Sequence, residues 1–145
     1  MFAYANTNSI DISANNPLDI RRAIATSMEP VLRKNNFIFS RCENTTYIYH
    51  HVNNPEISVT FTVNSSTRCI RCDLQRGNKN DLMANYPLSL FVQGNSCFKG
   101  IKNDGFWYFN SDEEFLAILE EQAELLVQFG FQWMFDHLKV ELEEC

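Results

Sequence analysis

Residues 57–75 read ISVTFTVNSSTRCIRCDLQ, and this stretch decides the fold class. From residue 57 to residue 63 every second side chain is apolar, and those between are Ser or Thr. Such alternation is typical of a β-strand with one buried face and one face in water. The pair Ser65-Ser66 turns the chain, and alternation resumes from Cys69 to Gln75. Strands joined by so short a connection pair antiparallel, so the stretch predicts the centre of an antiparallel sheet.

The same two-residue period extends on both sides of this stretch. Upstream, residues 37–40 and 47–50 alternate around aromatic side chains, and residues 53–55 (NNP) supply a turn. Downstream, the apolar run 88–92 is a candidate fifth strand, and residues 106–109 (FWYF) form a short aromatic strand or anchor. The pattern predicts an antiparallel meander of about 4–6 strands.

A helix is predicted before the strands. Asn16 suits an N-cap and Pro17 the first helical position, so we expect a helix over residues 17–34. Pro30 lies inside it and removes a backbone donor, which predicts a kink or break over residues 27–29.

Two helices are predicted at the end of the chain. Ser111 and Glu114 form a capping box, which is the best-defined boundary in the sequence. The positions predicted to be buried follow at helical spacing; they are Phe115, Ile118, Leu119, Gln122, Leu126 and Phe129. Gly130 is predicted to end this helix in the left-handed C-cap conformation, and a final helix begins at Phe131.

Together these signals predict an α+β fold with an N-terminal helix, the meander, and two C-terminal helices packed on one face. A length of 145 residues fits a single domain over residues 1–145. Residues 1–16 are rich in Asn, Thr and Ser and are predicted to be a loosely ordered arm. They contain no basic residue or long apolar run, and no later segment suits a membrane span, so we expect a cytoplasmic protein without a membrane partner.

Cysteine and histidine spacing does not predict a metal site, a cofactor site or a convincing catalytic site. The five cysteines are interpreted as reduced thiols. Cys69 and Cys72 are three residues apart in a strand, so they face opposite sides and are predicted to be one exposed and one buried thiol. A Cys/His enzyme remains an alternative, with Cys42 and His50 as nucleophile and base.

Negative charge is concentrated at the end of the chain. Residues 1–100 hold ten Lys/Arg and seven Asp/Glu, whereas residues 101–145 hold two Lys/Arg and eleven Asp/Glu. One segment therefore has net charge +3 and the other −9. If these carboxylates form one surface, that surface accelerates association with basic partners. The alternative is an ordinary solvated helix face, which would have the same composition.

Two further interpretations remain open. An RNA- or ligand-binding module could use a basic sheet face built from Arg41, Arg68, Arg71 and Arg76. The net charge of −6 disfavours nucleic acid. A homodimer would instead cover an apolar patch at residues 131–135 with a second copy.

The order of elements resembles a known group of small bacterial domains. The resemblance is carried by residues 36–41 (NFIFSR), 47–49 (YIY), 105–109 (GFWYF) and 111–114 (SDEE). Over residues 17–140 the layout of this chain is similar to that of domains that include immunity proteins of polymorphic toxin and contact-dependent growth inhibition systems. That family has no catalytic residues, so the resemblance assigns no catalytic role to any residue of this chain. The resemblance implies a cytoplasmic protein that binds a cognate toxin, often a nuclease, and blocks its active site.

A binding protein rather than an enzyme is therefore expected, with an acidic surface facing a basic toxin. Because a nuclease must be basic where it holds phosphates, an acidic surface can steer toward that cleft and occupy it. The predicted partner-binding residues are Asp112, Glu113, Glu120, Glu121 and Glu124, with Asp104 and Trp107 as a polar and aromatic pair nearby.

Overall fold

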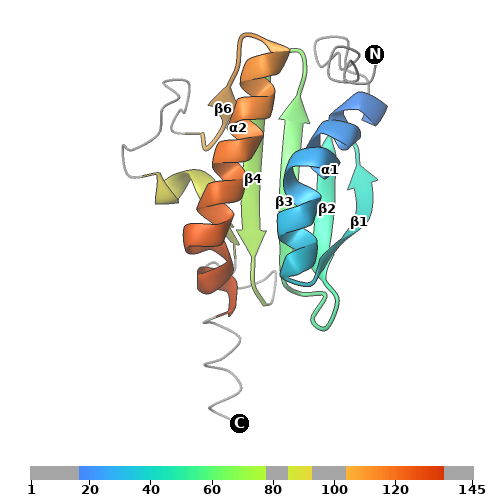
Figure 1. Cartoon of the computed structure of the whole chain (residues 1–145), viewed down its shortest axis with the longest axis vertical. Coiled ribbons are helices and arrows are strands. Elements are labelled where there is room, and N and C mark those ends of the chain that lie inside the picture. Colours follow the sequence, from blue (N-terminus) through green and yellow to red (C-terminus); the bar gives the residue numbers. More distant parts are fainter. Residues whose placement is uncertain (1–16, 78–84, 93–103, 136–145) are drawn as a thin grey trace.

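A computed structural model describes residues 17–77, 85–92 and 104–135 (Figure 1). The first elements are α1 (Pro17–Lys34), β1 (Phe37–Glu43), β2 (Thr46–His51), β3 (Ser58–Asn64) and β4 (Cys69–Gln75). They are followed by β5 (Asn85–Pro87), the 3-10 helix η2 (Leu88–Phe91), β6 (Trp107–Tyr108), α2 (Asp112–Leu125) and the π-helix η3 (Leu126–Gly130). The predicted arm at residues 1–16 lies outside the described residues.

The strands form one antiparallel sheet, as the alternation predicts. Its order is β1-β2-β3-β4-β5, and β6 also pairs with β4. β5 and β6 share that edge because they pair with different ends of β4. The candidate fifth strand at residues 88–92 is wrong, since Leu88–Phe91 form a 3-10 helix and the fifth strand is the shorter Asn85–Pro87. Only Leu88 in this helix is buried, so its apolar run does not have the alternation of a strand.

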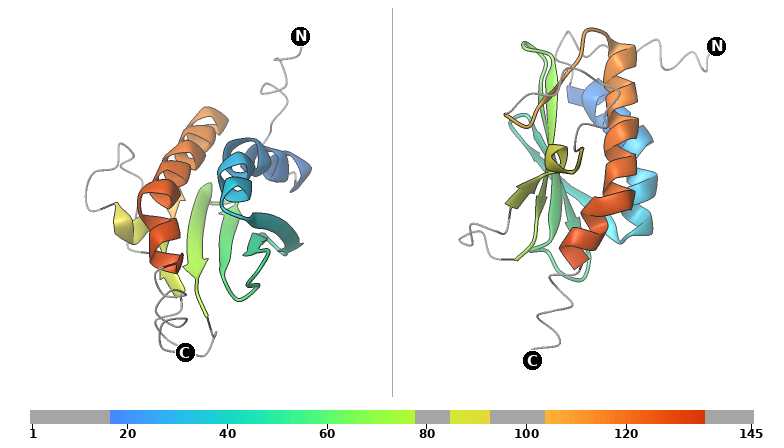
Figure 2. Two further views of the ribbon diagram at one scale, coloured as in Figure 1. Left: turned by 60° about the horizontal axis from the view of Figure 1, so that its bottom comes forward. Right: turned by 90° about the vertical axis from the view of Figure 1, so that its left-hand side faces the viewer.

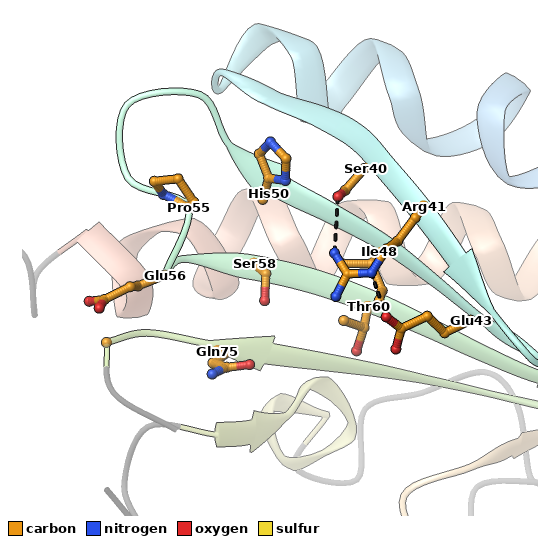
Figure 3. Close-up of a pocket in the computed structure, with 11 residues that line it drawn as sticks. Ser40, Arg41, Glu43, Ile48, His50, Pro55, Glu56, Ser58, Thr60 and Gln75 are labelled. Carbon is orange, nitrogen blue, oxygen red and sulfur yellow. Dashed lines mark hydrogen bonds and ion pairs between the residues drawn. The ribbon is translucent and has the colours of Figure 1, made fainter. Parts of the chain in front are cut away.

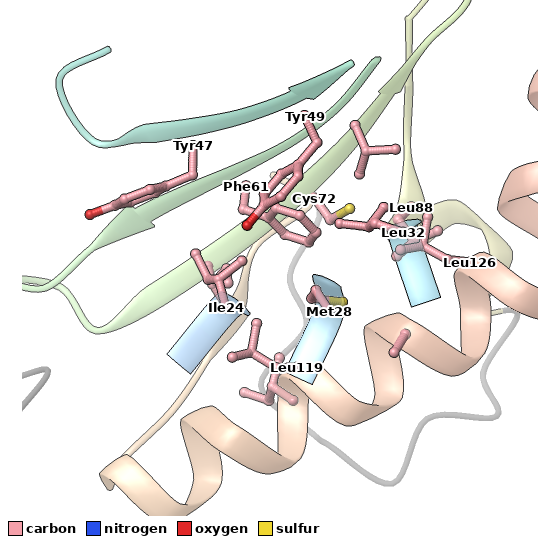
Figure 4. Close-up of a cluster of buried hydrophobic side chains, with 14 of the residues drawn as sticks. Ile24, Met28, Leu32, Tyr47, Tyr49, Phe61, Cys72, Leu88, Leu119 and Leu126 are labelled. Atoms are coloured by element: carbon pink, nitrogen blue, oxygen red, sulfur yellow. The ribbon is translucent and has the colours of Figure 1, made fainter. Parts of the chain in front are cut away.

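Both helices cover the same face of the sheet (Figure 2). The core lies between them and the strands, where side chains from α1, α2 and β1 to β4 interdigitate (Figure 4). Met28, Phe61 and Leu119, from three different elements, are each 0% exposed. Burial of this apolar layer is the main stabilising contribution to the α+β fold.

Helix α1 spans residues 17–34 as predicted, and of the predicted kink or break only the break is wrong. The helix continues without interruption through Pro30, although its axis bends along its length (Figure 2). Met28 and Leu32, on either side of Pro30, are fully buried against the core. Their packing maintains the helix although proline removes one backbone hydrogen bond. Tyr49 on β2 ties this helix to the sheet by donating a hydrogen bond to Glu29 Oε2 at 2.9 Å.

The predicted cap of α2 is confirmed. Ser111 Oγ accepts a hydrogen bond from the Glu114 backbone N–H at 3.1 Å. The Glu114 carboxylate returns to the backbone N–H of Asn110 at 3.0 Å, one residue before the cap. Two backbone donors at the start of the helix are thus satisfied by short-range contacts, which explains why the sequence locates this boundary well.

The predicted C-cap at Gly130 is wrong, because the helix continues through it. The Phe131 N–H donates to the Leu126 carbonyl five residues back, which is π-helical hydrogen bonding, and residues 131–135 remain helical. Phe129 is 41% exposed rather than buried, while Phe131 is 6% exposed. A Cβ on Gly130 would lie 3.0 Å from Leu126 Cδ2 and 3.3 Å from Leu74 Cδ1. Gly130 is therefore explained by close packing against Leu126 and Leu74, whose side chains would have to move by a few tenths of an ångström to admit a Cβ, and not by a left-handed backbone.

His51 gives the fold a pH dependence. Its ring is 8% exposed and packs edge-on against Phe37 at 5.3 Å, and burial lowers its pKa below 6.5. The unfolded chain consequently binds more protons below pH 6.5, so stability is fully present above that pH and falls as pH decreases toward the folded pKa. We expect a slope of at most about 1.4 kcal/mol per pH unit in the free energy of urea unfolding as the pH falls below 6.5. A His51→Phe variant should lose this slope, and an unchanged slope would contradict the assignment.

Candidate functional site

Three predicted partner-binding residues form one line on the outer side of α2. Glu113, Glu120 and Glu124 are exposed, and they are named the acidic stripe below. Glu120 and Glu124 lie seven and eleven residues after Glu113, close to two and three helical turns, so all three point away from the core. Among the described residues none of them forms an ion pair or hydrogen bond. At about 1.5 Å per residue the stripe is about 16 Å long.

Glu121 and Trp107 do not belong to that surface, which corrects two predicted site residues. Trp107 is 0% exposed and lies in the core, and its indole Nε1–H donates to Glu121 Oε2 at 2.9 Å. Glu121 is half-buried and satisfies the indole. Helical spacing alone places Glu121 beside Glu120. The structure distinguishes them, because Trp107 of β6 donates a hydrogen bond to Glu121 and not to Glu120.

Asp104 is hydrogen-bonded locally, whereas Asp112 Oδ1 is buried without a hydrogen-bond partner among the described residues. The Asp104 carboxylate accepts hydrogen bonds from the Phe106 N–H at 3.0 Å and from the Tyr108 hydroxyl at 2.8 Å. The latter bond raises the pKa of Tyr108 to about 12. Asp112 is half-buried in the first turn of α2. The predicted pairing of Asp104 with Trp107 is therefore wrong, because Asp104 organises the loop before β6.

The four arginines considered for a basic sheet face do not form one surface. Arg71 donates to both oxygens of Asp73 at 2.9 Å, and Arg41 pairs with Glu43. Arg68 donates to the Asn110 carbonyl at 2.9 Å. Arg76 points toward the helical layer, where its guanidinium lies 3.7 Å from the Trp133 ring centroid. Each guanidinium thus has its own local partner, which weakens the RNA-binding alternative.

The candidate nucleophile Cys42 and the candidate base His50 lie on opposite faces of the sheet. Cys42 pairs in register with buried Tyr47, whereas His50 pairs with Ser58 on the other face, so these two residues do not form a nucleophile and base. Cys69 and Cys72 face opposite sides as predicted, but both are buried, and the predicted exposed thiol is wrong. Cys69, on the open side of the sheet, is paired in register with Tyr108 of β6. Within the described ranges no group of three His, Cys, Asp or Glu side chains could hold a metal ion.

The apolar patch considered for a homodimer is mostly internal. Phe131 stacks on Phe37 with ring centroids 5.7 Å apart, and Met134 is 0% exposed. The exposed apolar side chains near this end are instead Leu90, Val127 and Phe129, at 55%, 60% and 41%. Residues 131–135 therefore contribute mainly to the core rather than to a free surface.

A second surface lies on the face of the sheet opposite the helices, where the sequence suggested a basic sheet face but did not indicate a hollow. This face, named the open face, carries a hollow of about 770 Å³ over β1 to β4 (Figure 3). The lining of the hollow includes Arg41, His50, Glu56, Ser58, Thr60 and Gln75. The alternation of Ser and Thr marks this side as wet, but a hollow depends on how neighbouring strands twist and on where their loops return.

These features define a two-layer α+β domain with an acidic helical side and a polar, hollowed sheet side. Comparisons with protein-family models, with curated proteins and with solved structures found no match. In the part of the chain that the structure describes, no helix combines the length and apolarity needed to cross a bilayer.

Proposed function

We propose that this chain is a cytoplasmic binding protein that neutralises a basic cognate toxin, such as a nuclease, by occluding its active site. The observation that carries the proposal is the acidic stripe, formed by Glu113, Glu120 and Glu124, which are exposed and have no partner among the described residues. The layout resemblance to immunity proteins supports the same class of function.

Electrostatics favours a basic protein as the partner. A nuclease cleft holds phosphates with Lys and Arg, and an acidic line about 16 Å long matches several such cations along a groove. Exposed charges mainly raise the association rate, while desolvated anchors determine most of the affinity. Glu121 and Trp107 support the stripe indirectly, because their hydrogen bond fixes α2 on the sheet.

The test begins with secreted basic proteins encoded beside this chain in its native genome. Each is expressed in a sensitive host with and without this chain, and protection from killing identifies the partner. The association rate is then measured with the Glu120→Lys/Glu124→Lys variant across salt concentrations. We expect the rate to fall about tenfold or more at low salt, with a weaker salt dependence.

A charge-matched control separates the stripe from net charge. The Glu43→Lys/Glu56→Lys variant makes the same charge change on the open face. At physiological ionic strength, where the Debye length is about 8 Å, it should retain the wild-type association rate within about threefold if the stripe docks, whereas the stripe variant should still associate more slowly. Equal slowing by both variants, or protection that survives without any loss of rate in the stripe variant, would overturn the proposed role of α2.

A further inference from the structure

The hollow on the open face holds a row of polar side chains that have no hydrogen-bond partner in the part of the chain that the structure describes. His50, Ser58 and Gln75 are direct cross-strand neighbours on β2, β3 and β4. Figure 3 shows all three projecting on the same side of the sheet. Among the described residues none of these side chains makes a hydrogen bond, although Ser58 is only 8% exposed. Polar groups in a recess that make no hydrogen bond within the protein are available to a ligand, which can replace the water that they face.

Thr60, the next residue along the same face of β3, indicates which chemical groups a ligand would present. Thr60, on the same face of β3, also lacks a side-chain partner among the described residues, whereas Thr62 two residues later bonds to Thr46 at 3.1 Å. Thr60 lines the hollow and Thr62 does not. Hydroxyl, imidazole and carboxamide groups both donate and accept, so they suit a ligand that presents amide N–H and C=O groups.

The charges on the rim favour a cation. Arg41 is held by Glu43 and by Ser40 Oγ, so its positive charge is largely compensated. Glu56, at the other side of the hollow, has an exposed carboxylate without an ion-pair partner in the described part of the chain. In the described part of the chain the charged lining residues are thus one Arg and two Glu, which disfavours phosphates. The lining also contains no Phe, Tyr or Trp ring on which a base could stack.

We propose that the hollow binds a peptide segment that presents a basic side chain, with its backbone amides on the polar row and its cation near Glu56. This site lies on the face opposite the acidic stripe, so it does not rest on the proposed function and could be occupied at the same time as a partner on α2. The domain is then a two-sided binding module.

The probe is N-acetyl-arginine N-methylamide, compared with its citrulline counterpart, which has the same shape and no charge. Each is titrated into the full-length, isotope-labelled chain and followed by NMR. We expect chemical-shift changes centred on His50, Ser58, Thr60 and Gln75, with arginine binding about two- to fivefold tighter than citrulline, as expected for an exposed ion pair. Glu56→Gln should remove that preference.

Thr60→Val and Thr62→Val form a matched pair on one strand and one face. Thr60→Val should weaken binding about three- to tenfold through loss of one hydrogen bond, while Thr62→Val leaves it unchanged. Thermal unfolding of both variants checks that each is folded. Equal weakening by the two variants, equal affinity for arginine and citrulline, or shifts confined to α2 would each overturn the proposal, as would failure to observe any shift at the highest probe concentration that the protein tolerates.

Discussion

Replacing Trp107 with alanine is expected to lower the free energy of unfolding by about 3–5 kcal/mol. The indole is 0% exposed, so truncation removes a large apolar surface and leaves a cavity between β6 and α2. It also leaves the half-buried Glu121 carboxylate without its indole donor. Urea unfolding followed by circular dichroism measures the loss through the shift of the midpoint at constant slope.

Two variants test this explanation. Trp107→Phe keeps most of the apolar volume but not the N–H, and should cost about 1–3 kcal/mol. Phe106→Ala changes the neighbouring aromatic residue, which is only half-buried, and should cost less than either. If Phe106→Ala proved as destabilising as Trp107→Ala, the central role assigned to Trp107 in the core would be wrong.

Replacing Gln122 with methionine is expected to stabilise the protein by about 1–3 kcal/mol. Gln122 is 0% exposed, and neither its Nε2 nor its Oε1 has a hydrogen-bond partner among the described residues. Its neighbours one turn away on α2 include Leu119 and Leu126, which are also 0% exposed. Methionine keeps the length and helix propensity while removing the unsatisfied amide.

An exposed glutamine on the same helical segment provides the control. Gln128→Met should change the unfolding free energy by no more than about 0.5 kcal/mol, because no buried polar group is involved. Destabilisation by Gln122→Met would show that the amide is satisfied, for example by an enclosed water molecule, and would contradict the prediction.

Local patterns predicted the elements because short-range physics determines them. The alternation in residues 57–75 requires strands, and the Ser111 cap depends on contacts within four residues. The predictions that were wrong concern details that depend on packing between segments far apart in the sequence. Gly130 lies against Leu74, so a signal interpreted as a helix end became a close contact inside a continuing helix. The apolar run at residues 88–92 likewise became η2, in which Leu88 is buried and Leu90 is 55% exposed, while Phe91 and Val92 pack against the edge of the core.

The candidate site was predicted only in part for the same reason. Glu113, Glu120 and Glu124 remain exposed as helical spacing predicts, whereas Glu121 is hydrogen-bonded to Trp107. The spacing of residues along a helix determines the direction in which each side chain points from the axis of that helix. It does not reveal what another segment, here β6, brings to that side. The hollow was missed because it exists only where β1 to β4 lie side by side.

The sequence by itself determined the α+β class, the antiparallel meander, the capped start of α2 and the acidic character of its outer side, because each depends on periodicity or on contacts between near neighbours. Only the tertiary structure decided which polar groups are satisfied and which remain available. Hydrogen bonds such as Trp107 to Glu121 and Tyr49 to Glu29 join residues 14 and 20 positions apart, and the cross-strand row His50, Ser58 and Gln75 spans three strands. Such pairings follow from chain packing, which no local pattern encodes.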